Sequence, residues 1–135
     1  MAREFLFVDT GAFYSLLDKT DKNHQNVRQV FDATTEPLIT SNFIVDELVT
    51  LLRARNFAVA QIQNYIEAIL NEKTCRLLRV SLEVESRAWE MLKKYKDVTF
   101  SYTDCTSFIL MKDHNISKAI TTDEHFRIAG FEIIP

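Results

Sequence analysis

The chain has 135 residues, a length that fits one domain able to bury a substantial core. Its net charge of -3 excludes a globally basic surface, so a nucleic-acid ligand would require local cationic patches or metal ions. With only 2 glycines and 2 prolines, the sequence favours long regular elements and argues against an all-β sandwich, which needs many turns.

The first half of the chain alternates short apolar runs with helical patterns. In chain order, we expect a strand over residues 5–8, helices over 11–17 and 23–34, a strand over 38–40, and helices over 42–54 and 57–70. Ser41 or Asn42 is expected to cap the helix that runs to about Ala54, because either side chain can accept a hydrogen bond from the first turn. The last two helices follow one another closely and predict a helical hairpin.

The second half continues this alternation. We expect a strand over residues 75–80, helices over 82–96 and 102–114, and strands over 118–121 and 131–134. Ser81 is expected to cap the first of these helices. Strands that alternate with helices predict βαβ units, and hence an α/β fold with a parallel sheet covered on both faces. Ligands of such sheets bind at the carboxyl ends of the strands.

The cysteines and the absence of a long apolar run indicate where in the cell the protein is located. Cys75 and Cys105 have neither the spacing of a metal site nor the number needed for a disulfide framework, so we expect two free thiols. No apolar run approaches the length of a membrane span, and the N-terminus runs directly into a short apolar stretch. We therefore expect a single soluble domain over residues 1–135, located in the cytoplasm and without membrane contact.

Four acids that are far apart in sequence lie in or beside apolar stretches. They are Asp9, Glu47, Asp104 and Asp123. Asp9 and Asp123 each follow an expected strand, which places them on the functional edge of a parallel sheet. An unpaired carboxylate near a core costs on the order of several kcal/mol, and several of them together repel one another unless cations intervene. These acids therefore predict a divalent metal site, which in turn indicates hydrolysis of a charged substrate.

Glu47 and Asp104 lie inside expected helices. Glu47 shares an apolar stripe with Ile44 and Leu51, and no Lys or Arg stands four residues away, so a functional role is favoured over a structural one. Its neighbour Asp46 falls on the polar face and is expected to be solvated. Asp104 lies in the first turn of its helix, where an acid also stabilises the helix dipole, so both interpretations of this residue remain open.

Four segments resemble, in order and spacing, the four motifs of the PIN-domain nucleases. They are FVDTGAF at residues 7–13 with DKNH at 21–24, TSNFIVDEL at 40–48, SYTDCTSF at 101–108, and TTDEHF at 121–126. The resemblance covers almost the whole chain, and the chain's size is similar to that of the VapC-type toxins of bacterial toxin–antitoxin pairs. It implies a three-layer α/β/α fold with a central, mainly parallel sheet of four to five strands.

The same resemblance implies a reaction and a set of site residues. It implies endonucleolytic hydrolysis of RNA with one or two Mg²⁺ or Mn²⁺ ions, and it makes Asp9, Glu47, Asp104 and Asp123 the catalytic acids and the metal ligands. Asp9 and Asp104 are expected to bind the metal directly or through water, whereas Glu47 and Asp123 are expected also to orient water. Thr10 and Thr122 are candidate hydroxyl groups for the site, and Gly11 stands where many family members have Ser.

Partners follow from the toxin resemblance. It implies an RNA substrate and a small antitoxin that lays a segment across the acidic groove. The expected hairpin over residues 43–70 is the candidate groove for the apolar part of that antitoxin. The family also implies a homodimer through apolar helix faces.

Other interpretations of the sequence compete with a toxin nuclease. A housekeeping RNA-processing nuclease and a catalytically silent RNA- or protein-binding module on the same fold both remain alternatives. Asp9-Thr10-Gly11 also matches an aspartic-protease signature, but that fold is β-rich and helical periodicity dominates here. The three histidines share no metal-ligand spacing, and His125 is expected only to orient the turn after Asp123. Trp89 is expected in the core.

Overall fold

The computed structural model describes residues 4–135, so residues 1–3 of the expected domain lie outside the described part. Five short strands form one sheet in the order β3-β2-β1-β4-β5, and every neighbouring pair is parallel. In chain order the strands are β1 (Leu6–Val8), β2 (Leu38–Ser41), β3 (Arg76–Leu78), β4 (Lys118–Ile120) and β5 (Glu132–Ile134). The expected parallel sheet of four to five strands is confirmed.

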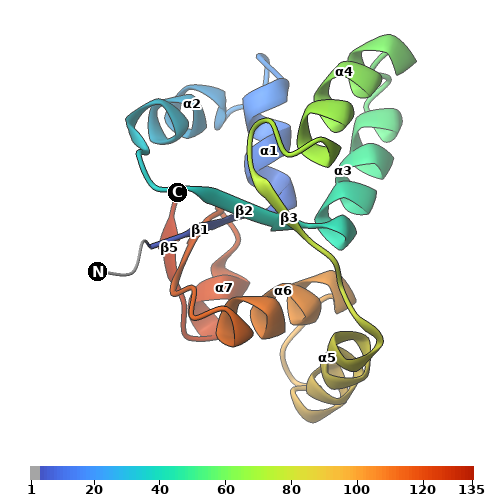
Figure 1. Cartoon of the computed structure of the whole chain (residues 1–135), viewed down its shortest axis with the longest axis vertical. Coiled ribbons are helices and arrows are strands. Elements are labelled where there is room, and N and C mark those ends of the chain that lie inside the picture. The colour runs from blue at the N-terminus through green and yellow to red at the C-terminus, as the bar shows by residue number, and fades with distance from the viewer. Residues whose placement is uncertain (1–3) are drawn as a thin grey trace.

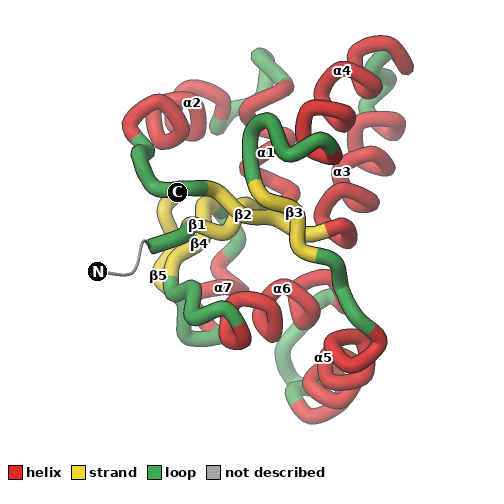
Figure 2. Tube along the Cα trace, viewed as in Figure 1, coloured by secondary structure: helices red, strands yellow, loops and turns green. Residues whose placement is uncertain are grey.

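Helices cover both faces of this sheet. In chain order they are α1 (Thr10–Leu17), α2 (His24–Ala33), α3 (Asn42–Ala54), α4 (Val59–Leu70), α5 (Leu82–Lys94), α6 (Tyr102–Asp113) and α7 (Glu124–Ile128). Helices α1 to α4 lie on one side of the sheet, and α5 to α7 lie on the other (Figure 1). The trace coloured by secondary structure shows the same three layers (Figure 2). Among the residues described, no helix combines the length and apolarity needed to cross a bilayer.

Strand β1 lies at the centre of the sheet, between β2 and β4. Leu6 stands opposite Leu38 on one side and Lys118 on the other. The carboxyl ends of β1 and β4 are therefore neighbours at the same edge. Polar side chains that directly follow these two strands therefore lie close together at that edge, as expected for a parallel sheet.

The helix starts agree with the sequence patterns. Ser41 accepts a hydrogen bond from the backbone N–H of Ile44 at 3.2 Å, and Ser81 caps α5 in the same way through Val84. Helices α3 and α4 pack against each other as the expected hairpin. Helix α7 was not predicted, because its five residues are too few to show a helical period.

The core is built around α6, which is buried along most of its length. Phe108 of this helix packs edge-on against Phe126 of α7, with ring centroids 5.0 Å apart, and Phe126 lies near Phe7 of β1. These aromatic contacts pack the middle of α6 against α7, and α7 against β1. The prediction that Trp89 is in the core is wrong: its side chain is 53% exposed, and its ring meets Tyr102 edge-on.

Candidate metal centre

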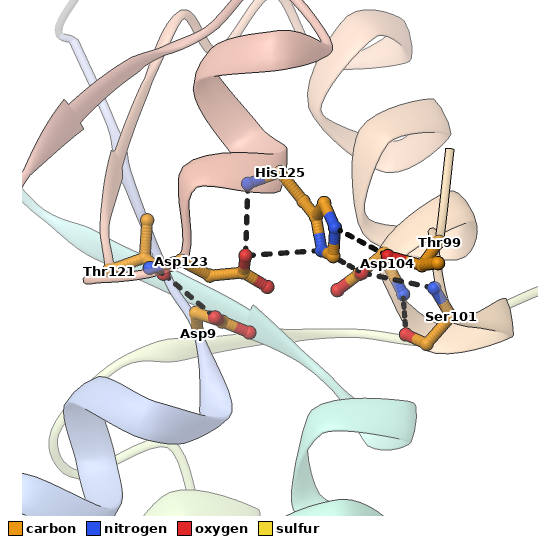
Figure 3. A network of polar contacts seen from close by, with 7 residues as sticks. All are labelled: Asp9, Thr99, Ser101, Asp104, Thr121, Asp123 and His125. Atoms are coloured by element: carbon orange, nitrogen blue, oxygen red, sulfur yellow. Dashed lines mark hydrogen bonds and ion pairs between the residues drawn. The ribbon is translucent and has the colours of Figure 1, made fainter. Parts of the chain in front are cut away.

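Asp9 and Asp123 reach the same site from neighbouring strands. Asp9 directly follows β1, and its carboxylate accepts a hydrogen bond from the hydroxyl of Thr121 at 2.8 Å. Thr121 follows β4, and its Oγ1 also accepts a hydrogen bond from the backbone N–H of Asp123 at 3.0 Å. One buried hydroxyl therefore positions both acids (Figure 3). Thr121, which the sequence did not single out, makes these contacts, whereas the candidate hydroxyl of Thr122 is exposed.

Asp104 contributes from the first turn of α6. It forms a capping box with Ser101: the Ser101 N–H donates to Asp104 Oδ2 at 3.1 Å, and the Asp104 N–H donates to Ser101 Oγ at 2.9 Å. The structural interpretation of this residue is therefore correct. The functional interpretation is compatible with it, since the same carboxylate, 9% exposed, also faces the acids of the sheet edge.

His125 lies between two of these acids (Figure 3). Its Nδ1 is 3.2 Å from Asp123 Oδ1 and 3.4 Å from Asp104 Oδ2. Its Nε2 is 3.2 Å from the hydroxyl oxygen of Thr99. The sequence predicted for His125 only a role in the local turn, since its second partner, Asp104, comes from another helix. Its position two residues after Asp123, inside a short unpredicted helix, was the available signal.

Glu47 belongs to the site by a different route. It lies on α3, half-buried, and its Oε1 accepts a hydrogen bond from the hydroxyl of Thr10 at 2.7 Å. Thr10 follows Asp9, so this contact links Glu47 to the end of β1. Thr10, Asp46, Glu47 and Thr50 line an open hollow of about 440 Å³, and Asp46 is exposed there, as expected.

The electrostatics of the site are dominated by uncompensated negative charge. Burial raises the pKa of Asp9 from an ordinary 3.8 to about 7, and the negative charges of Asp104 and Asp123 add to this effect, although the Thr121 hydrogen bond opposes it. Burial also raises the pKa of Asp104, with Asp123 and Glu47 adding to the rise. Across residues 4–135, His125 is the one basic side chain within ion-pair distance of any of the four acids.

This donor set fits a divalent cation. Single ligand atoms of Asp104, Asp123 and His125 all lie within 4.8 Å of one another, close enough for one ion to contact them together. The charges of Asp104 and Asp123 raise the pKa of Asp9, and that of Glu47 raises the pKa of Asp104, so the four acids are electrostatically linked. Carboxylate oxygens are the ligands that Mg²⁺ and Mn²⁺ prefer. Bound cations would also remove the mutual repulsion that the cluster now contains.

Comparisons with known proteins identify relatives of this architecture. The family model of the PIN domain matches residues 6–132. The chain is 31% identical, over 129 residues, to the 23S rRNA-specific endonuclease VapC20 of Mycobacterium tuberculosis, and the match covers 93% of this chain and 95% of the relative.

Solved structures agree in fold. The crystal structure of Mycobacterium tuberculosis VapC20, described as a Sarcin-Ricin loop cleaving toxin, superposes with a TM-score of 0.86 at 29% identity and covers 93% of this chain and 95% of that one. FitAcB from Neisseria gonorrhoeae gives a TM-score of 0.70 at 16% identity, with 96% of each chain covered. A toxin-antitoxin complex from Klebsiella pneumoniae gives 0.67 at 14% identity, again with 96% of each chain covered.

Proposed function

The chain belongs to the PIN-domain family, and we therefore propose that it is a divalent-metal-dependent endoribonuclease and the toxin half of a toxin–antitoxin pair. The observation that carries the proposal is the meeting of Asp9, Asp104 and Asp123 at one sheet edge, with the pKa of Asp9 raised to about 7. Similarity to VapC20, a 23S rRNA-specific endonuclease, supports RNA as the substrate.

The four acids divide the work of the site. A divalent cation would neutralise charge on the scissile phosphate and make water a better nucleophile. Asp104 and Asp123 would hold it, and Asp9 would hold it from the end of β1. Glu47, fixed by Thr10 on the rim of the open hollow, would orient the attacking water. Thr121 would hold Asp9 and the backbone of Asp123 in place during each round of cleavage.

Cleavage of ribosomal RNA is the direct test of this function. Purified full-length protein would be incubated with intact bacterial ribosomes, and separately with extracted ribosomal RNA, in Mn²⁺ or Mg²⁺ and with or without EDTA. Asp104→Asn removes a charge but keeps an oxygen that can accept the Ser101 N–H bond, so the capping box survives. His114→Ala, at an exposed position, is the matched control.

The expected result is discrete cleavage by wild type and His114→Ala, cleavage that is slower by roughly 100- to 1,000-fold in Asp104→Asn, and none in EDTA. Equal cleavage by wild type and Asp104→Asn would place the activity elsewhere. A protein that binds RNA without cutting it under any of these conditions would instead be a silent binding module.

The toxin assignment makes a separate prediction in cells. Induced expression of wild type should arrest growth, whereas Asp104→Asn should not. Co-expression of a small protein encoded beside this chain should restore growth and co-purify with it. Growth arrest that no neighbouring gene relieves would favour a housekeeping nuclease.

An apolar pocket offers a place for the antitoxin. A pocket of about 240 Å³ lies between α1, α2 and α4, and its lining includes Phe13, Leu17, Phe31, Tyr65 and Ile69. It shares only α4 with the hairpin expected from the sequence, so we propose this pocket as the more specific site for an apolar antitoxin side chain. Replacing Ala68 in its lining by Arg should weaken co-purification of the antitoxin without reducing RNA cleavage.

A homodimer completes the proposal. Helix α5 exposes Leu82 and Trp89, which are apolar side chains of the kind that dimer interfaces bury. Light scattering at micromolar concentration should give twice the mass of the chain. A monomer at that concentration would overturn this part.

A further inference from the structure

The proposed function assigns the cation to the acids, yet the ring of His125 lies directly between two of them. Its Nδ1 faces carboxylate oxygens from two different elements, Asp123 at the start of α7 and Asp104 at the start of α6, at 3.2 and 3.4 Å. A ring nitrogen and two carboxylate oxygens lie within 4.8 Å of one another, close enough for one ion to contact all three. Figure 3 shows the ring between the two acids.

The ring is oriented independently of these carboxylates. Its Nε2 lies 3.2 Å from Thr99 Oγ1, and its edge packs at 84° against the ring of Phe100, with centroids 5.5 Å apart. Both partners come from the segment that precedes α6. A histidine that binds a metal through one nitrogen commonly has the other nitrogen fixed by an oxygen acceptor, which sets the tautomer and the ring plane. The side chain is 27% exposed, so an ion can reach it from solvent.

We propose that His125 is a ligand of the metal ion through Nδ1, beside Asp104 and Asp123, with its Nε2–H donating to Thr99 Oγ1. This rests on the proposed metal centre and adds a nitrogen to its oxygen ligands. Mg²⁺ prefers oxygen ligands, whereas Mn²⁺ and other transition metals also accept imidazole. His125 therefore gives the site a preference for Mn²⁺ over Mg²⁺.

A purely positioning role makes different predictions. In that case Nδ1–H would only donate to the two carboxylates and hold them together. His125→Asn separates the two roles, because the Asn amide places an N–H donor close to the position of Nδ1 but supplies no nitrogen ligand. If His125 only positions the acids, His125→Asn should behave like wild type.

The test uses Mn²⁺ alone as the probe on the full chain, without RNA. Pulsed electron paramagnetic resonance detects magnetic coupling between Mn²⁺ and a directly bound imidazole nitrogen. Wild type and the exposed control His114→Asn should show this coupling, and His125→Asn should lack it. Calorimetric titration should show that His125→Asn weakens Mn²⁺ binding by at least about tenfold and Mg²⁺ binding by much less.

A second measurement uses wild type alone, so it does not depend on the folding of a variant. When the protein is grown with histidine that carries the heavy nitrogen isotope, the magnetic coupling must change with the isotope. Mn²⁺ bound to wild type without nitrogen coupling would overturn the role of His125 and leave the metal centre standing. Failure of wild type to bind Mn²⁺ at all would overturn both.

Discussion

Asp9 and Glu47 are each held by one threonine hydroxyl at nearly the same distance, 2.8 and 2.7 Å, yet their surroundings differ. Asp9 is 8% exposed and faces two other carboxylates, so its pKa is raised to about 7 by burial and then by those charges. Glu47 is half-buried on the rim of an open hollow. The same type of hydrogen bond therefore serves two purposes. At Asp9 it offsets part of the free-energy cost of burying the carboxylate, and at Glu47 it orients a partly solvated carboxylate.

This contrast separates the acids into two pairs. The inner acids, Asp9 and Asp104, are buried and depend on a cation for the stability of their charged forms. The outer acids, Glu47 and Asp123, are partly solvated. Substitutions at the two pairs should accordingly differ both in which property they change, stability or activity, and in the size of that change.

The largest expected effect is at an inner acid. Asp104→Asn should lower the rate of RNA cleavage by roughly 100- to 1,000-fold, the range found when one preorganised electrostatic group is removed from an active site. Single-turnover cleavage would measure it, and circular dichroism would confirm that the capping box with Ser101 still supports α6. A loss under tenfold would place Asp104 among the merely structural residues.

Asp9→Asn should lower RNA cleavage while stabilising the metal-free protein. The Asn side chain can still accept the Thr121 hydrogen bond, but it carries no charge to bury. At about pH 8, the free energy of unfolding should rise by an amount on the order of a few kcal/mol, since a pKa that differs by one between the folded and unfolded chain corresponds to about 1.4 kcal/mol. Urea unfolding in EDTA would measure this, with Asp46→Asn as an exposed control. An unchanged or reduced stability would contradict the burial argument.

Glu47→Gln should have an intermediate effect. Because Glu47 is assigned to orienting water, cleavage should fall by roughly 10- to 100-fold, as for other groups that orient rather than bind. The affinity for Mn²⁺ should change less than the rate of cleavage does, because Glu47 is not assigned to hold the ion. A loss of Mn²⁺ affinity as large as the loss of cleavage would erase the distinction between inner and outer acids.

The smallest effect is expected at Gly11, in the first turn of α1 between the two threonine-held acids. A Cβ built there meets no atom within 4 Å. Gly11→Ala should therefore stabilise the protein by about 0.5 kcal/mol, through the lower conformational freedom of the unfolded chain, and leave cleavage unchanged. A matched Gly11→Ser variant would show whether a hydroxyl at this position raises activity. Reduced cleavage by Gly11→Ala would mean that the backbone here takes part in the site.

The fold was largely predictable because its signals are local. Each strand contains at least two consecutive apolar residues, and Ser41 and Ser81 mark the helix starts. Helix α7 lacks such a signal, as it is too short for a period. Trp89 was misplaced because its exposure depends on how α5 lies on α6, which periodicity within α5 does not report.

The acids of the site were predictable from the sequence, whereas the residues that position them were less so. Asp9 and Asp123 follow strands, and strand order brings such residues to one edge. Thr121, rather than Thr122, points at Asp9 because the direction of each side chain at the end of β4 is set by the pleat and the register with β1. His125 gains its role from Asp104, which is distant in sequence, so no local pattern reveals it.

If the buried carboxylates oppose folding until a cation binds them, thermal melting across pH with and without Mn²⁺ must reveal it. The folded-state pKa of Asp9, about 7, lies above its ordinary 3.8, so the folded protein holds a proton that the unfolded chain releases between these values. Stability therefore falls as pH rises through this window. We predict a metal-free melting temperature that decreases from about pH 5 to about pH 8, and a rise of several degrees on adding saturating Mn²⁺ at about pH 8. A melting temperature that neither falls with pH nor responds to Mn²⁺ would contradict the metal centre described above.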